Sequence, residues 1–451
     1  MDKREYADIN AVLRSDDGTA AAFLRLVSHP ADLVETLRLI DTNEWGRLLL
    51  LIDNLETRAE VVASLDEDER DTLFEQISNQ EIGVLVREMD SDDAADVIGE
   101  LEPDEKAEAL AHMEADDRAM VEVLLSYPED SAGGIMQVER AQVSQRTTVE
   151  ETTQLLRELV QEGIDPHVVY IVNDDGQLMG TVDMVDLVLN PPSRRVGDFA
   201  EAPKATAPPL LDQEEVANLF RKYDLVALPV VDADGRLLGR VVFDDIVDVL
   251  TEEAEEDALL MAGTDREELL YRDRAFRIAL VRLPWIGINL LGSLVSAFLL
   301  HLYEPVMEQA IIIAAFIPVI TAMGGNVGTQ SATIITRGLA TGRVDFRDLP
   351  KILFREFRVG LFMGLVCGIG VGIISVFLFG NGKVALGLVV GIAMLSAMTA
   401  AALAGTLAPA VMKQLNIDPA IASGPFVTTA NDIIGIVIYM STAIAFIEYL
   451  K

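Results

Sequence analysis

The chain has 451 residues, enough for about three domains of ordinary size, and 35 basic against 73 acidic side chains give a net charge of −38. So acidic a chain repels phosphate backbones, which argues against DNA or RNA as a partner. The single cysteine, Cys367, excludes an intramolecular disulfide framework and a cysteine-rich metal site.

Charge and hydrophobicity separate along the chain at Leu260. Residues 1–260 hold 21 basic and 61 acidic side chains, whereas residues 261–451 hold 14 and 12. The sequence opens without an apolar core, so we expect no cleavable signal peptide. We therefore expect the acidic half to stay in the cytoplasm and the apolar half to lie in a membrane.

The first 128 residues contain a repeat of about 12 residues, in which an apolar residue is followed by acidic or helix-capping residues. The copies begin near positions 40, 52, 65, 77, 89, 101 and 113. Such acidic and capping residues are typical of helix starts, so each copy predicts a helix of two or three turns. Short helices that each bury one face favour an all-α superhelical domain over residues 1–128.

From residue 129 to residue 250, strands and helices alternate in two similar halves, residues 129–196 and residues 197–250. Each half reads as a strand, an Asp-Gly turn, a second strand and a helix. This duplicated α/β unit resembles a tandem pair of CBS domains.

CBS pairs that bind adenine nucleotides typically use a Ser/Thr-x-x-Asp step. The aspartates of that step are present here as Asp186 and Asp245, but Asp183 and Val242 occupy the hydroxyl positions. This departure makes nucleotide binding by the pair doubtful.

Residues 251–275 predict an acidic connecting helix that leads to the membrane half. Its first turns carry many like charges at helical spacing, and these repel one another. A helix of this kind is stabilised by bound divalent cations, especially when a second acidic surface faces it.

Five apolar stretches in residues 276–451 are long enough to cross a bilayer, which takes about 20 residues each. They are Leu283–Leu300, the segment between Glu308 and Arg337, the segments Arg358–Lys383 and Lys383–Lys413, and Pro419–Ile447. Basic residues precede the first stretch and lie in the loops after the second and fourth, which places these loops and the acidic half in the cytoplasm. We expect a multi-pass protein of the cell (inner) membrane, surrounded by lipid.

Polar, glycine-rich segments lie within two of these spans, at residues 324–330 and residues 423–425. We expect them to break the spans, because unsatisfied backbone at membrane depth is tolerated only in a protein interior or a wet cavity. Asp432 follows the second break, and an ionisable residue inside a span indicates an ion pathway. Its hydroxyl and amide neighbours make an oxygen-only environment, which suits hard cations such as Mg²⁺ or Ca²⁺. The third span carries a small-residue face that we interpret as helix packing, made of Gly360, Gly364, Gly368 and Gly372.

Four motifs and the order of the parts carry a resemblance to one family. The motifs are Asp130–Met136 (DSAGGIM), Gly324–Thr333 (GGNVGTQSAT), Arg337–Ala340 (RGLA) and Pro425–Gly435 (PFVTTANDIIG). The whole chain resembles the MgtE magnesium transporters. The resemblance implies a multidomain protein with an all-α superhelical N domain, tandem CBS domains, an acidic connecting plug helix and a transmembrane domain of five helices.

For the membrane half, the resemblance implies a homodimeric, Mg²⁺-selective channel with its pore at the dimer axis. Asp432 of both subunits is expected to hold a hydrated Mg²⁺, helped by groups near Gly325, Asn326 and Thr428. Family members often have Asn where this chain has Gly424, so the pore is expected to lack one polar contact.

For the cytoplasmic half, the resemblance implies a Mg²⁺ sensor in which bound cations lock the plug helices over a closed pore. The matching positions are Glu60, Asp92, Asp96, Gly134, Asp212, Glu214, Asp224, Asp245, Asp248, Glu253, Glu256, Asp257 and Asp418. Electrostatics predicts the same effect of cations, because a strongly acidic half stores repulsion that cations neutralise.

We therefore interpret the chain as a gated Mg²⁺ channel and not as an enzyme, since passive flow needs no coupled chemistry and no nucleotide-hydrolysis motif is visible. One alternative is a proton- or sodium-coupled exporter of divalent cations (Mg²⁺, Mn²⁺ or Co²⁺) that uses Asp432 as the exchanging carboxyl. The other is a membrane-tethered CBS metal sensor that signals to a partner.

Overall fold

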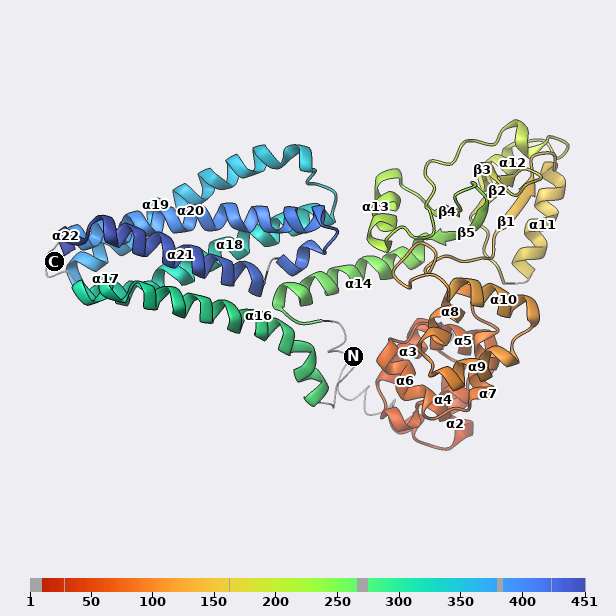
Figure 1. Ribbon diagram of the computed structural model, residues 1–451. Helices are drawn as coiled ribbons and strands as arrows, with labels where there is room; N and C mark the ends of the chain where they lie inside the picture. Colours follow the sequence, from red (N-terminus) through yellow and green to blue (C-terminus); the bar gives the residue numbers. More distant parts are fainter. Residues whose placement is uncertain are drawn as a thin grey trace. The chain divides into compact units, whose positions relative to one another are not determined.

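The computed structural model describes residues 10–27, 29–161, 163–265, 275–378, 384–422 and 424–450. The chain divides into two compact units, Met1–Leu250 and Thr251–Lys451, and each is described by itself (Figure 1).

The first unit begins with a stack of short helices that follows the sequence repeat. They are α2 (Asp17–Leu24), α3 (Pro30–Arg38), η1 (Thr42–Glu44), α4 (Trp45–Leu50), α5 (Leu55–Ala63), α6 (Glu67–Phe74), α7 (Asn79–Val86), α8 (Ser91–Glu100), α9 (Pro103–His112) and α10 (Ala115–Leu124). From α5 onward the N-caps recur every 12 residues, at Asn54, Asp66, Ser78, Asp90, Glu102 and Glu114. The predicted superhelical all-α domain is confirmed.

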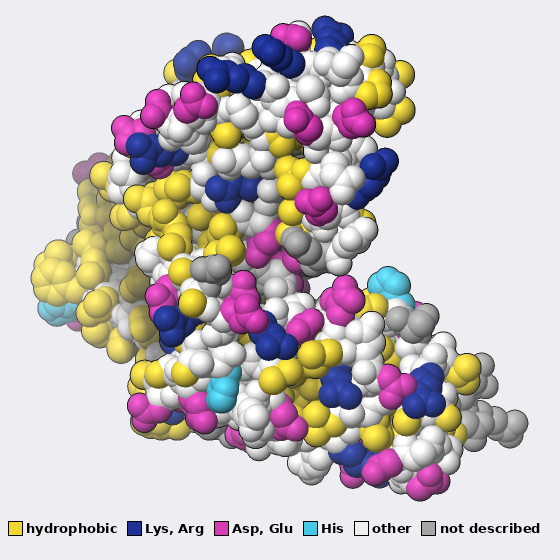
Figure 2. Space-filling model, turned by 90° about the vertical axis from the view of Figure 1, so that its right-hand side faces the viewer, with side chains coloured by type: hydrophobic (Ala, Val, Ile, Leu, Met, Phe, Trp, Pro, Cys, Tyr) yellow, Lys and Arg dark blue, Asp and Glu magenta, His cyan; other side chains and the backbone are white. Residues whose placement is uncertain are grey.

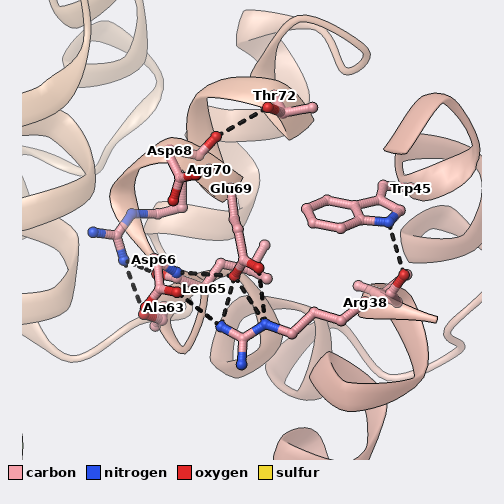
Figure 3. Close-up of polar contacts among 10 residues, drawn as sticks. Arg38, Trp45, Ala63, Leu65, Asp66, Asp68, Glu69, Arg70 and Thr72 are labelled. Carbon is pink, nitrogen blue, oxygen red and sulfur yellow. Dashed lines mark hydrogen bonds and ion pairs between the residues drawn. The ribbon is translucent and has the colours of Figure 1, made fainter. Parts of the chain in front are cut away.

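Several helices of the stack pack on the next helix but one: α3 on α5, α5 on α7, α7 on α9, and α8 on α10. Ion pairs also join helices of the stack that are separated in the sequence. Arg38 of α3 reaches Glu69 of α6 at 2.7 Å and Asp66, the N-cap of that helix, at 3.1 Å (Figure 3). Arg38 therefore neutralises acidic residues at the start of a helix that lies 28 to 31 residues further along the chain.

The second part of the first unit is α/β and has two equivalent halves. Its elements are β1 (Ala141–Ser144), α11 (Val149–Gln161), β2 (Val168–Val172), β3 (Leu178–Asp183), α12 (Met184–Leu189), η2 (Val196–Asp198), α13 (Gln213–Tyr223), β4 (Ala227–Val231) and β5 (Leu237–Val242). In one sheet β1 is parallel to β2 and β2 is antiparallel to β3, and in the other β4 is antiparallel to β5.

The register shows that the two halves are duplicates. Val168 pairs with Asp183 in the first hairpin and Ala227 with Val242 in the second, and both hairpins have a register shift one residue before their strand ends. The turns carry glycines in the left-handed region, Gly176 at φ 80° and Gly235 at φ 78°. The predicted tandem arrangement is confirmed.

A continuous apolar core joins the helical stack to the second CBS half, since it includes Ile98 and Leu124 together with Leu228 and Ile246. The first CBS half has a separate core around Val169 and Ile171. On the face drawn in Figure 2, acidic side chains spread over the surface with basic ones between them.

The acidic connecting helix is α14 (Phe243–Ala262). It begins at Phe243, where the acidic run Asp244–Asp257 predicts a long helix, and so before the expected domain boundary at residue 251. It ends at Ala262 because Gly263 adopts φ 80° and donates its N–H to the carbonyl of Leu260, a glycine C-cap. Residues 266–274 of the predicted helix lie outside the described part of the chain.

The second unit contains long apolar helices and shorter helical segments between and after them. They are α16 (Ala275–Leu302), α17 (Glu304–Gln309), η3 (Ile311–Phe316), α18 (Ile317–Ala340), η4 (Phe346–Asp348), α19 (Leu349–Leu378), α20 (Val384–Gln414), η5 (Pro419–Ala422), α21 (Pro425–Ala445) and α22 (Ile447–Leu450). Among the residues that the structure describes, five helical segments are long and apolar enough to cross a membrane, which confirms the five predicted spans.

One expectation for these spans is wrong. Helix α18 runs without interruption through residues 324–330, where the sequence predicted a break. The glycines serve close packing instead: the carbonyl of Gly328 lies 2.2 Å from the place that a Cβ on Gly405 of α20 would take. In the last span the expected break is present, since η5 ends at Ala422 and α21 begins at Pro425.

The small-residue face of the third span packs against α20, as predicted. A Cβ at Gly364 would lie 2.8 Å from the Cα of Leu395, and one at Gly368 would lie 2.6 Å from the carbonyl of Gly391. Because no side chain stands between them, the backbones of α19 and α20 approach each other closely.

Candidate metal sites

The first candidate site is a cluster of carboxylates where the start of α8 meets the start of α14, within the first unit. Asp92 is 6% exposed, and its pKa lies well above the ordinary value because of burial and of the charges of Asp245 and Asp93. Burial, Asp244 and Asp93 raise the pKa of Asp245 to about 7, and Asp92 lies within hydrogen-bonding reach of it. The two carboxyl groups thus face each other from two domains.

Further carboxylates surround this pair. Burial and the charge of Asp90 raise the pKa of Asp93 to about 6, against the opposing effect of Arg70. Burial and Asp93 raise the pKa of Asp96 to about 7, although its side chain keeps contact with solvent, which screens it. Asp93 therefore interacts more strongly with the buried pair than Asp96 does.

A serine at the N-terminus of α8 holds the cluster in place. The hydroxyl of Ser91, 4% exposed, donates to Glu139 at 2.6 Å and accepts the N–H of Val138 at 2.9 Å. These bonds tie α8 to the segment before β1, so the positions of Asp92 and Asp93 are fixed relative to the CBS pair.

The donor set of this cluster fits a hard cation. One oxygen of Asp92 and one of Asp245 are buried without a hydrogen-bond partner among the described residues. Buried carboxylates without partners are costly, and Mg²⁺ prefers such oxygen ligands. Across the described ranges, however, no three carboxylate, histidine or cysteine side chains converge on one point. An ion here would be held by one or two carboxylates, with water completing its shell.

The other expected sensor residues of this unit lie around the cluster or apart from it. The charge of Asp248 helps to raise the pKa of Asp93. The charge of Glu60, which is exposed on α5, helps to raise the pKa of Asp90. Gly134 is tightly packed, since a Cβ there would lie 2.4 Å from the carbonyl of Pro128.

Helix α13 carries three more expected sensor residues. Asp212 is its N-cap, Glu214 lies in its first turn, and Asp224 is its C-cap at φ 49°. An 11-residue helix is about 16 Å long, so the structure does not bring Asp224 together with the other two.

In the second unit, the end of α14 carries the remaining sensor residues, among them Glu253 and Glu256. Asp257 forms an ion pair with Arg337 of α18 at 3.5 Å, and burial, with the nearby charge of Asp418, raises the pKa of Asp257. The structure therefore brings Asp257 and Asp418 together.

The second candidate site is on α21 in the membrane unit. Asp432 is partly buried in the second turn of that helix, and no described residue donates a hydrogen bond to it or pairs with it. One turn earlier, the hydroxyl of Thr428 lies 3.3 Å from that of Thr329, and a Cβ at Gly325 would lie 3.4 Å from the methyl group of Thr428. Three of the expected pore residues are thus on adjoining faces of α18 and α21.

The other two expected pore residues are placed differently. Asn326 lines a cavity of about 550 Å³ with Thr329 and Gln330 and with Phe362 of α19. Gly424 is the N-cap of α21, and a Cβ there would lie 2.4 Å from the carbonyl of Met261 at the end of α14. A side chain at position 424 has no room, which explains glycine there.

The sequence-based reasoning missed several residues. Asp90 and Asp93 belong to the same acidic run as Asp92, but nothing local shows which of its members turn inward. Arg337 was assigned only to a motif and a cytoplasmic loop. Asn431, buried beside Asp432, was counted only as a polar neighbour.

Three models of known protein families match parts of the chain. A model described as a divalent cation transporter matches residues 317–442, one described as the MgtE intracellular N domain matches residues 28–130, and a CBS domain model matches residues 196–252.

Named relatives extend over most of the chain. The magnesium transporter MgtE of Bacillus subtilis is 36% identical over 330 residues, which cover 73% of this chain and 72% of the relative. The magnesium transporter MgtE of Thermus thermophilus is 36% identical over 335 residues, 73% of either chain.

Two solved structures resemble the cytoplasmic part. The cytosolic domain of the Mg²⁺ channel MgtE in complex with ATP has a TM-score of 0.50 and 31% identity, covering 53% of this chain and 97% of its own. The soluble part of a magnesium transporter has a TM-score of 0.50 and 25% identity, covering 56% of this chain and 99% of its own.

Proposed function

The chain belongs to the MgtE family of magnesium transporters, and from this premise we propose that it is a homodimeric, Mg²⁺-selective channel closed by cytoplasmic Mg²⁺. It is a multi-pass membrane protein with an intracellular N domain, and its relatives are transporters rather than enzymes. Conduction, gating and dimerisation are each supported by a separate observation.

Conduction is supported chiefly by Asp432. A carboxylate inside a span is costly and therefore indicates an ion pathway, and no described residue pairs with this one. The hydroxyl of Thr428 and the backbone near Gly325 add neutral oxygen atoms on the adjoining faces. Mg²⁺ loses its water reluctantly, so a hydrated ion held by Asp432 of two subunits suits this set.

Gating is supported by the carboxylate cluster around Asp92 and Asp245. Without cations these buried acids repel one another across the junction of the helical stack and the CBS pair. Bound Mg²⁺ would remove the repulsion and hold the two domains together. We assign the same role to the remaining sensor positions, most of which lie on or beside α5, α8, α13, α14 and η5. They are Glu60, Asp96, Gly134, Asp212, Glu214, Asp224, Asp248, Glu253, Glu256, Asp257 and Asp418.

Closure is supported by the contacts that the end of α14 makes with α18 and α21 within the second unit. The carbonyl of Met261 contacts Gly424 at the start of the helix that carries Asp432, and Asp257 pairs with Arg337 of α18. Holding α14 in this position would keep the pore closed.

Dimerisation is supported by an apolar surface on α12. Val185, Val188 and Leu189 are 66%, 83% and 75% exposed, and solvent-facing aliphatic side chains on one short helix are costly unless a partner covers them. We expect a second copy of the chain to cover them. Chemical cross-linking in detergent, followed by mass determination, would detect the dimer.

A relative's cytosolic domain is described in complex with ATP. We propose no nucleotide for this chain, because Asp183 and Val242 stand at the hydroxyl positions of the nucleotide-binding step.

The test is Mg²⁺ uptake into liposomes by the purified protein, with Asp432→Ala as the pore variant. We expect uptake by the wild type that the variant loses, because the carboxylate that we assign to the pore is gone. Asp348→Ala, an exposed acid on η4 that pairs with Lys351, is the control and should keep full uptake. Uptake that survives Asp432→Ala contradicts the pore assignment.

The same assay separates the alternatives. Uptake that requires a proton or sodium gradient would favour the coupled exporter. A folded wild-type protein without uptake under any condition would favour the tethered sensor.

A further inference from the structure

The amide of Asn431, the residue before Asp432, is buried without a partner. Its side chain is 1% exposed, and neither its oxygen nor its nitrogen has a hydrogen-bond partner among the described residues. A buried amide without partners costs free energy, so an apolar side chain of similar size would make the helix bundle more stable. Something other than stability keeps Asn431 in this place.

The amide of Asn431 lies against a glycine on the neighbouring helix. A Cβ at Gly328 of α18 would lie 1.7 Å from the Asn431 nitrogen and 3.1 Å from a methyl group of Val427. On its other side, Gly328 presents its carbonyl to Gly405 of α20 at 2.2 Å from the position of a Cβ. Helices α18, α20 and α21 therefore meet at Gly328 with no free space between them.

This contact fixes how α21 is rotated about its axis. Successive residues of a helix point about 100° apart, so the direction of Asn431 determines that of Asp432. The bond between Thr428 and Thr329, one turn earlier, holds the same pair of helices at 3.3 Å. Leu has as many side-chain heavy atoms as Asn but not its planar amide, so Leu at this position does not reproduce the contact with Gly328.

We propose that Asn431 is a positioning residue, whose contact with Gly328 aims the carboxylate of Asp432 at the conducted ion. This inference rests on the proposed function and adds a residue that sets its specificity. The proposal explains why a buried amide without partners is present: the orientation of Asp432 toward the ion offsets the loss of stability.

The test measures uptake and thermal unfolding of the full-length protein, reconstituted and in detergent. For Asn431→Leu we expect Mg²⁺ uptake to fall about tenfold, the size of coupling found between contacting residues, and the ratio of Mg²⁺ to Ca²⁺ uptake to change. The unfolding temperature should stay equal to that of the wild type or rise, because a buried polar group without partners has been removed.

A double-variant cycle keeps the test decisive if one variant folds poorly. Gly328→Ala should reduce uptake, because its methyl group meets the Asn431 nitrogen. Adding Asn431→Ala should restore part of that loss, because the two contacting groups then no longer overlap. The control Ser375→Ala removes another buried polar group, a hydroxyl bonded to the carbonyl of Gly372, and should leave the ion ratio unchanged.

Three outcomes overturn the proposal. One is wild-type uptake and ion ratio in Asn431→Leu. Another is a loss of uptake matched by a lower unfolding temperature and an unchanged ion ratio, which marks a purely structural role. The third is a folded wild-type protein without uptake, which overturns the proposed function as well, whereas the first two leave that function standing.

Discussion

At the scale of single residues, the cytoplasmic carboxylates are unusual in how poorly they are compensated. Asp92, Asp93 and Asp245 have raised pKa values because burial and like charges disfavour their ionised forms. The basic residue that opposes this for Asp93 is Arg70, which is already paired with Glu100. The cluster therefore destabilises the folded state at neutral pH unless protons or metal ions bind it.

This gives a pH dependence with a definite sign. The pKa values of Asp93 and Asp245, about 6 and about 7, exceed their value of about 4 in an unfolded chain, so the folded protein binds more protons between these limits. The stability from these groups is fully present below pH ~4 and is lost as pH rises through 6 to 7, by about 1–2 kcal/mol per group after screening.

We expect the full-length protein in chelator to unfold at a higher temperature at pH 5 than at pH 8. Asp93→Asn should raise the unfolding temperature at pH 8 and weaken the dependence on pH. Added Mg²⁺ should stabilise the wild type more at pH 8 than at pH 5, because metal and protons compete. Equal stabilisation by Mg²⁺ at both pH values would count against the cluster as a cation site.

Gly424 yields a second prediction at this scale. Gly424→Ala would place a methyl group 2.4 Å from the carbonyl of Met261, so the end of α14 has to move away from α21. We expect Mg²⁺ uptake at high cytoplasmic Mg²⁺ to increase about threefold or more, as a weakened contact shifts the population toward the open state. Gly370→Ala, where a Cβ meets nothing within 4 Å, is the matched control. Unchanged closure in Gly424→Ala would show that this contact does not hold the pore shut.

At the scale of elements, the N-terminal helices are held by arginines that bridge repeats. Arg70 of α6 donates to the carbonyls of Ala63 and Leu65 at 3.0 and 2.7 Å (Figure 3). Arg70 also donates to Glu100 at 2.9 Å. Arg70 and Glu100 are only 13% and 14% exposed, whereas Arg25 and Asp53 form a pair that is 64% and 61% exposed.

The two pairs should therefore differ in energy. Arg70→Ala is expected to cost about 3–5 kcal/mol of unfolding free energy, because it leaves a carboxylate and two carbonyls without a partner. Arg25→Ala is expected to cost less than about 1 kcal/mol. Denaturant unfolding of the full chain, followed by far-UV circular dichroism, checks both values. Equal losses of unfolding free energy would show that burial does not set the difference between the two ion pairs.

The contact between α19 and α20 gives the corresponding prediction for the membrane unit. Gly368→Val would direct a branched side chain at the carbonyl of Gly391, 2.6 Å from the Cβ, and should cost about 1–3 kcal/mol through overpacking. Gly370→Val on the same helix projects into open space and should be nearly neutral. Thermal unfolding in detergent compares the two, and a neutral Gly368→Val would mean that α19 and α20 are not closely packed.

At the scale of the whole molecule, much of the fold was predictable because local patterns encode it. The N-caps every 12 residues and the two Asp-Gly hairpins appear directly in the sequence, as do the five apolar spans. The continuity of α18 was not predictable, because glycine favours both a break and a close helix contact, and only the neighbour at Gly405 decides between them.

The candidate sites were predictable only in part for a related reason. The intramembrane position of Asp432 follows from the chain around it. The approach of Asp92 to Asp245 joins two domains, and it was expected only through the family resemblance. The inward turn of Asp93 and the fit of Asn431 against Gly328 depend on tertiary packing, which one sequence does not reveal.

The proposed gating requires one property above all: Mg²⁺ must both pass through the pore and close it from one side. The most direct measurement is Mg²⁺ flux through oriented membranes while Mg²⁺ is raised on the cytoplasmic face alone, with Asp432→Ala as background. We predict that flux falls as cytoplasmic Mg²⁺ rises and that the same Mg²⁺ on the opposite face does not suppress it. Flux that rises and saturates with Mg²⁺ on either face would contradict the account.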